Sequence, residues 1–348
     1  MSDSASQEPD PDSEEAKLAS LEISDLETPS PSKSTTSPLI AWAQLVRLPN
    51  VFTVLADVSA AYVLVAHGPQ PLGRFVCVLL AAVALYWAGM VLNDVFDVER
   101  DTAERANRPI PAGDISLRQA SLAGWTLLVV GVLLGAASGY LPGNSVSGSW
   151  LPGAIAFLLA IMIVAYDGPL KKTRLAPLAM GSCRVLSFLL GAAPCLTLQA
   201  NSSLIPIYVL ALAAGFGIYI TGITTMARRE ATGGRSPNLL FGFIVVLVGL
   251  IVLAYAPSMS SSGGWRIRPD KDYPMLIGLI SIPIVWRGLR VQSDPTPSTI
   301  QNMIRTGILS IIPLAASIAF LGAGQFAGLS VLALFVPATL LAKWLRVT

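Results

Sequence analysis

The stretch with the most reactive side chains is NDVFDVERD at positions 93–101. In a helix, Asn93, Asp97 and Asp101 would be spaced four residues apart, and Asp94 would precede Asp97 by three, so the four share one face. Carboxylates that close repel one another unless a cation neutralises them. Oxygen ligands in this number suit Mg²⁺, which commonly bridges to phosphate oxygens. The spacing therefore predicts a magnesium site made by these four side chains.

The alternative for this segment is a solvated acidic loop, with its carboxylates paired to Arg100, Arg105 and Arg108. Two observations favour the metal site: the acids keep helical register, and they follow an apolar run, where a membrane boundary makes charge costly. Outside the first 37 residues the chain has 12 acidic residues, and six of them lie between positions 94 and 114.

The composition indicates which elements position these residues. Of 348 residues, 53% are hydrophobic and 13% are charged, about half of the ~25% charged residues of soluble domains. The mean hydropathy is +0.64. These values indicate a polytopic membrane protein, and a net charge of +2 argues against a nucleic-acid partner. The single histidine, His67, excludes histidine-based metal sites, and three cysteines in apolar runs indicate buried thiols.

Apolar runs close to the ~20 residues that cross a bilayer recur along the chain. They predict an all-α transmembrane bundle of about nine to ten helices, because the alternating polarity of β-barrel strands is absent. The expected helices cover 38–66, 75–96, 117–140, 150–166, 175–198, 203–226, 238–257, 273–290, 300–321 and 326–345.

The first 37 residues differ from the rest and predict a separate segment. They hold nine acidic residues and two lysines, a net charge of −7, and no aromatic residue, so we expect a disordered acidic tail before a membrane domain at 38–348. Among the predicted connections, 15 Lys and Arg residues fall on one side and four on the other. The positive-inside rule then predicts that both termini of this multi-pass cell-membrane protein are cytoplasmic.

Charged residues also occur inside the predicted helices. Arg47, Asn50 and Asp57 share one face of the first helix, and Arg184 lies more than two turns into the fifth. Facing lipid, these groups would be costly, so they are expected to face a cavity or another helix. For Arg184 we expect an inward side chain paired with phosphate or with Asp57, and snorkelling to the surface is the alternative.

The 93–101 segment, followed by Arg108-Pro109-Ile110-Pro111-x-Gly113, resembles the first signature of the UbiA intramembrane prenyltransferases. The resemblance spans residues 40–320 and implies about nine helices with two polar motifs on the cytoplasmic side. Tyr166-Asp167-x-x-Leu170-Lys171 resembles a family element whose lysine faces the diphosphate, and Arg47-x-x-Asn50 resembles another recurrent pair. The resemblance thus implies substrate-binding roles for Arg47, Asn50, Asn93, Arg108 and Tyr166, and catalytic roles for Asp94, Asp97, Asp101 and Lys171.

The second family motif, usually another aspartate cluster, departs from the pattern. Here positions 227–234 read ARREATGG, similar to the divergent EboC-like members, and Glu230 is the one anionic ligand for a metal. Arginine can neutralise phosphate without a metal, so Arg228 or Arg229 is expected to bind substrate, with a role as a membrane anchor as the alternative.

The predicted function is a Mg²⁺-dependent intramembrane prenyltransferase. It would move an isoprenyl group from an isoprenyl diphosphate to a lipophilic acceptor, aromatic or hydroxyl-bearing, in the bilayer. A CDP-alcohol phosphatidyltransferase is a second reading, because Asp167-Gly168 begins its signature, but the further acids of that signature are absent. A non-enzymatic transporter is a third, although its acids would be expected near mid-membrane.

Overall fold

The computed structural model describes residues 37–143, 148–196, 204–228, 233–234, 236–260 and 264–345. The predicted tail at 1–37 lies outside this part of the chain except for Ser37, and so do Arg229 and Glu230. Every element within it is helical, and no strand occurs among the described residues. The helices are α2 (Pro38–Leu45), α3 (Val51–Ala66), α4 (Leu72–Phe96), α5 (Val98–Glu104), α6 (Leu117–Ser138), α7 (Leu151–Ala165), α8 (Ala176–Ala192), α9 (Ile207–Ala227), α10 (Pro237–Tyr255), α11 (Asp272–Ser293), α12 (Pro297–Leu309), α13 (Ile311–Ala323), α14 (Gln325–Ala333) and α15 (Phe335–Trp344).

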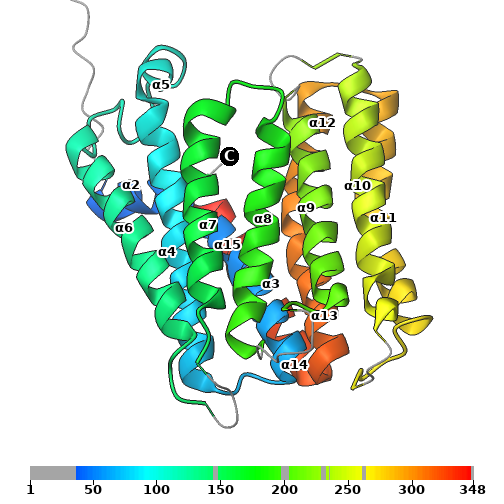
Figure 1. Ribbon diagram of the computed structural model, residues 1–348. Helices are drawn as coiled ribbons and strands as arrows, with labels where there is room; N and C mark the ends of the chain where they lie inside the picture. The colour runs from blue at the N-terminus through cyan, green and yellow to red at the C-terminus, as the bar shows by residue number, and fades with distance from the viewer. Residues whose placement is uncertain are drawn as a thin grey trace, which may run out of the picture. The chain divides into compact units, whose positions relative to one another are not determined.

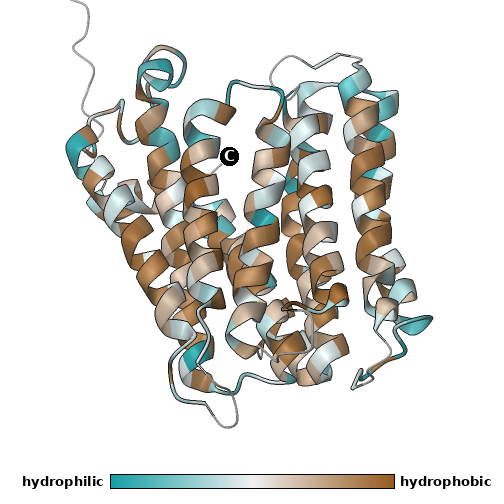
Figure 2. Cartoon of the chain, viewed as in Figure 1, coloured by the Kyte–Doolittle hydropathy of each residue, from teal (hydrophilic) through white to brown (hydrophobic). Residues whose placement is uncertain are grey.

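Within the described residues, ten helical segments are long and apolar enough to cross a membrane, which confirms the predicted all-α bundle. They run alongside one another, with the connections gathered at the two ends (Figure 1). Apolar residues dominate the middle of the bundle and polar residues collect at its ends (Figure 2). This distribution matches a bilayer core flanked by two aqueous surfaces.

Close helix contacts hold the bundle together, as expected where lipid provides no hydrophobic drive between helices. A Cβ added to Gly191 of α8 would lie 2.5 Å from the Val58 carbonyl oxygen on α3. A Cβ added to Gly222 of α9 would lie 2.6 Å from the Gly242 carbonyl oxygen on α10. Any side chain at either glycine would therefore force the two helices apart.

Three of the expected helices cross the bundle as predicted but are each interrupted, which the prediction did not include. The first is split into α2, a short 3₁₀ turn at Leu48–Asn50 and α3, the ninth into α12 and α13, and the tenth into α14 and α15. Each first piece ends four residues before a proline, namely Pro49, Pro313 or Pro337. Proline lacks an N–H for the carbonyl four residues earlier, and its ring clashes with that carbonyl.

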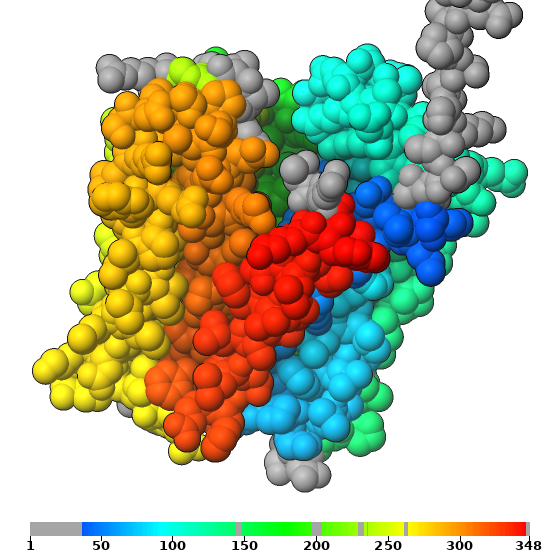
Figure 3. Space-filling model, turned by 180° about the vertical axis from the view of Figure 1, so that it is seen from behind, coloured from blue at the N-terminus to red at the C-terminus, as the bar shows by residue number. Residues whose placement is uncertain are grey.

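The break in the first helix shapes the end of the bundle where the acidic segment lies. Arg47 adopts a left-handed backbone conformation, with φ 47° and ψ 56°, between α2 and the 3₁₀ turn. On the opposite side of the molecule from the view of Figure 1, α15 crosses the bundle surface (Figure 3). It packs against the 3₁₀ turn and against α3.

Candidate functional site

The junction of α4 and α5 positions the predicted carboxylates. Asp97 ends α4 with φ −93° and ψ 3°, yet the backbone hydrogen bonds continue: Asp97 donates to the Asn93 carbonyl at 3.1 Å and Asp101 donates to the Asp97 carbonyl at 2.8 Å. The helical register expected for Asn93, Asp97 and Asp101 therefore persists across the junction. Asn93, Asp94 and Asp101 are buried, and Asp97 is partly exposed.

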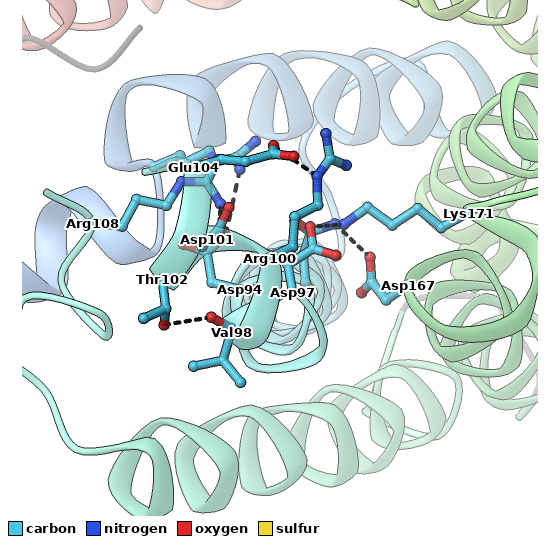
Figure 4. Close-up of polar contacts among 12 residues, drawn as sticks. Asp94, Asp97, Val98, Arg100, Asp101, Thr102, Glu104, Arg108, Asp167 and Lys171 are labelled. Atoms are coloured by element: carbon cyan, nitrogen blue, oxygen red, sulfur yellow. Dashed lines mark hydrogen bonds and ion pairs between the residues drawn. The ribbon is translucent and has the colours of Figure 1, made fainter. Parts of the chain in front are cut away.

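A cation faces each of the three aspartates. Arg108 Nη1 lies 3.1 Å from Asp94 Oδ1 and also pairs with Asp101, while Arg47 Nη2 lies 3.6 Å from Asp94 Oδ1. Figure 4 shows Arg108 reaching from the α5–α6 connection to the aspartates. Arg47 and Arg108 thus converge on the same carboxylate, that of Asp94, although they lie 61 positions apart in the sequence.

The end of α7 closes the other side of the site. A π-helical turn at Tyr166–Leu170 contains Pro169 and brings Lys171 into an ion pair with Asp97. In the same turn Asp167 accepts a hydrogen bond of 2.9 Å from Asn93 Nδ2, whereas its Oδ2 is buried with no hydrogen-bond partner in the described structure. Single π-helical turns recur at functional sites because they redirect side chains. Tyr166 is half-buried beside these groups.

The sequence places Asp167 in the Tyr166–Lys171 element and suggests it as a proton acceptor, but not as a ligand beside Asn93; in the structure it is 5% exposed and contacts Asn93 directly. The available signal was its spacing: Asp167 precedes Lys171 by four residues, which places both on one side of a helical turn. Together the site contains four carboxylates and three cations. This balance explains how charged groups are tolerated at the end of an apolar bundle.

Other predicted site residues lie further from this cluster. Arg228, at the end of α9, donates a hydrogen bond to the carbonyl of Thr173, which belongs to the connection that follows Lys171. Asn50 lies next to the Arg47 turn, and its carbonyl accepts a 2.8 Å hydrogen bond from the Thr53 hydroxyl. Arg229 and Glu230 lie outside the described residues.

Arg184 reaches the first helix rather than the carboxylate cluster. Its Nη1 donates to Asp57 Oδ2 at 2.6 Å and its Nη2 donates to the Thr53 hydroxyl at 3.2 Å. Asp57 is fully buried and its Oδ1 has no partner in the described part of the chain. Arg184 was expected to pair with a phosphate or with Asp57, and the structure shows the pair with Asp57.

The carboxylates of the cluster face cations rather than one another. Within the described residues, no group of three or more His, Cys, Asp or Glu side chains is gathered closely enough to hold a metal ion. The chemistry that this arrangement supports is recognition of an anion by the cations, with oxygen ligands alongside for a hard divalent metal.

Fold and site define a multi-pass α-helical membrane protein whose charged site lies at one end of the bundle. The sequence profile described as the UbiA prenyltransferase family matches residues 54–299, more than two thirds of the chain. The chain belongs to the UbiA prenyltransferase family, and the protein is a prenyltransferase. The phosphatidyltransferase and transporter readings are therefore not retained.

Curated relatives show the same family over different lengths. The digeranylgeranylglyceryl phosphate synthase of Methanobrevibacter smithii is 25% identical over 286 residues, 77% of this chain and 94% of that protein. The synthase of the same name from Metallosphaera sedula is 31% identical over 130 residues, 37% of this chain. That second match spans 42% of the relative's length.

Solved structures share the fold. A digeranylgeranylglyceryl phosphate synthase structure aligns with a TM-score of 0.59 and 19% identity, over 83% of this chain and all of that one. A UbiA homologue from Archaeoglobus fulgidus bound to GPP and Mg²⁺ aligns with a TM-score of 0.52 and 16% identity, over 84% of this chain and 99% of that one. At these identities the similarity establishes the helical architecture.

Proposed function

We propose that this prenyltransferase takes its isoprenyl group from a prenyl diphosphate, uses Mg²⁺, and transfers the group to a lipophilic acceptor within the membrane. The observation that carries the proposal is the α4–α5 face, on which three aspartates in helical register each meet a cation. Paired charges of this kind at the end of an apolar bundle suit a substrate with a charged head and an apolar tail.

The cations provide the diphosphate site in this proposal. Breaking the bond between the isoprenyl carbon and the diphosphate develops negative charge on the leaving group, so cations fixed beforehand lower the barrier. Lys171 and Arg108 are partly exposed, with 20% and 22% of their side-chain surface accessible. Both can therefore contact a bound diphosphate, together with Arg47. Arg228, which is bonded to the Thr173 carbonyl, is a further candidate cation.

The oxygen ligands suit Mg²⁺ by their chemistry, and because the described carboxylates are paired with cations and not gathered around one point, they would have to leave those cations to hold the ion. Asn93, Asp94, Asp97 and Asp101 would hold the ion, and the unpartnered Oδ2 of Asp167 provides a further buried oxygen beside Asn93. When bound, Mg²⁺ supplies Lewis-acid stabilisation of diphosphate oxygens. The A. fulgidus homologue bound to GPP and Mg²⁺ supports the use of this ion. Glu230 remains a predicted ligand for a second ion.

The names of the relatives narrow the class of molecule that would accept the isoprenyl group. Several are named for the synthesis of digeranylgeranylglyceryl phosphate, a glyceryl phosphate that carries isoprenyl chains. We infer a hydroxyl on a lipid precursor as the first acceptor to test, and an aromatic acceptor as the second. The basic connections further support a cell-membrane location with the candidate site on the cytoplasmic side.

The test is a diphosphate-release assay on the purified full-length chain. The protein is supplied with geranyl or geranylgeranyl diphosphate, Mg²⁺ and either a glycerol-based isoprenyl lipid or a phenolic lipid. We expect Asp97→Asn to lower release by 100-fold or more, whereas Glu99→Gln, an exposed acid of the same segment, is the matched control. Release that is unchanged in Asp97→Asn, or independent of Mg²⁺, would overturn the proposal.

A further inference from the structure

A second polar pocket lies between α11 and α12 and shares no residue with the candidate active site. It has a volume of about 240 Å³ and is lined by Trp286, Arg287, Arg290, Ser298, Thr299 and Asn302. The two helices form the yellow and orange surface at the left of Figure 3. Since a water occupies about 30 Å³ of liquid, the pocket has room for a phosphate group.

The lining of this pocket is cationic and rich in hydrogen-bond donors. Arg287 and Arg290 form no ion pair with any described residue. No carboxylate lines the pocket; Asp294, on the connection between the helices, uses its backbone N–H to bond the Arg290 carbonyl at 2.8 Å. Guanidinium groups without a protein partner beside hydroxyl and amide groups are suited to bind phosphate oxygens.

The surrounding surface places this pocket at the level of lipid headgroups. Along α11, Leu279, Ile282 and Leu289 are more than half exposed, so this face contacts lipid tails. Trp286, between Ile282 and Leu289 on the same face and directly before Arg287, is 70% exposed in the second half of α11. Exposed tryptophan next to arginine is typical of the membrane–water interface.

We propose that the pocket between α11 and α12 binds the phosphate of an anionic phospholipid headgroup. Arg287 and Arg290 supply the charge, and Asn302 supplies a neutral donor, while the Ser298 hydroxyl lies 3.2 Å from the Thr296 hydroxyl at the start of α12. The acyl chains would lie along the exposed apolar face of α11. A basic pocket between membrane helices is the arrangement by which anionic headgroups are recognised, and the proposal does not depend on the donor or acceptor of the prenyl reaction.

Native mass spectrometry of the full-length protein in neutral detergent tests this site. Phosphatidylglycerol is titrated into wild type, into Arg287→Gln/Arg290→Gln, and into Arg266→Gln/Arg268→Gln, which removes equal charge from residues outside the pocket. Each arginine near an anionic lipid contributes roughly fivefold in affinity, so the pocket variant should bind phosphatidylglycerol about 25-fold more weakly. The control variant should bind as wild type does.

Two further arms separate a lipid site from a site for soluble phosphate. Phosphatidylcholine should bind more weakly than phosphatidylglycerol to wild type and be little affected by the pocket variant. Inorganic phosphate should not displace phosphatidylglycerol at millimolar concentration. Equal losses in the pocket and control variants, or displacement by inorganic phosphate, would overturn the lipid assignment. Circular dichroism of both variants checks that the helical fold is intact.

Discussion

The Asp57–Arg184 ion pair allows the sharpest quantitative prediction. Arg184 Nη1 lies 2.6 Å from Asp57 Oδ2, the Asp57 side chain is fully buried, and 11% of the Arg184 side-chain surface is exposed. Replacing Arg184 by Gln leaves the carboxylate of Asp57 in the bundle without a counter-ion. Breaking a buried pair by removing one partner costs roughly 3–5 kcal/mol. We therefore expect Arg184→Gln to lower the free energy of unfolding by about that amount.

The double variant Asp57→Asn/Arg184→Gln removes both charges and isolates their interaction. Because no uncompensated carboxylate remains, it should be less destabilised than Arg184→Gln alone, by about 1–3 kcal/mol. The matched control is Arg100→Gln, which breaks an exposed pair in which Arg100 Nε lies 2.9 Å from Glu104 Oε2. Exposed pairs contribute at most about 1 kcal/mol.

Equilibrium unfolding of the full-length protein in mixed micelles, with rising fractions of a denaturing detergent, measures these differences. The buried pair should also be insensitive to salt between 0.05 and 0.5 M, roughly, whereas the effect of Arg100→Gln should fade, because screening acts on exposed charges. If Arg184→Gln costs no more than Arg100→Gln, or if the double variant is at least as destabilised as Arg184→Gln alone, the pair does not stabilise the bundle as argued.

Three further predictions concern the end of the bundle opposite the candidate site, the contacts between helices, and the candidate site itself. Arg74 is 1% exposed and donates to two backbone carbonyls at 2.7 Å. Arg74→Gln should therefore lower the free energy of unfolding by roughly 2–4 kcal/mol, measured by thermal unfolding. Turnover per folded molecule should be preserved. Gly191→Val should separate α3 from α8 and cost roughly 2–4 kcal/mol in the same measurement, since its Cβ would meet the Val58 backbone. Lys171→Gln should reduce diphosphate release roughly 100-fold in steady-state kinetics with helical content unchanged, because the leaving diphosphate loses a cation that would stabilise its developing charge.

The ten spans could be predicted from the sequence because length and apolarity decide whether a segment crosses a bilayer. The interruptions were also within reach, since Pro49, Pro313 and Pro337 each follow a helix end by four residues. The rule is not absolute: Pro283 lies inside α11 without ending it. Whether neighbouring groups compensate a lost backbone hydrogen bond depends on tertiary packing, which one sequence does not reveal.

The candidate site could likewise be predicted only in part. The register of Asn93, Asp97 and Asp101 follows from local helix geometry, and so could be predicted. The contact between Asn93 and Asp167 joins residues 74 positions apart, and depends on how α4 packs beside the end of α7. Long-range pairings of this kind are set by the bundle as a whole. The sequence predicted Asp57 as a partner of Arg184 and Arg108 as an alternative partner of the acids, but not the contact between Asn93 and Asp167 or the pair of Lys171 with Asp97.

The charge balance of the site gives a physical reason for combining cations with oxygen ligands. Asp94, Asp97, Asp101 and Asp167 outnumber the cations Arg47, Arg108 and Lys171 by one. A diphosphate entering this site would meet carboxylates beside the cations, and like charges repel most strongly where the dielectric constant is low. A divalent cation on the carboxylates would reverse that balance and release the lysine and arginines to contact phosphate. In the proposed function, the aspartates would pair with the cations until a divalent ion neutralises them, so that binding of the ion and binding of the donor would be coupled.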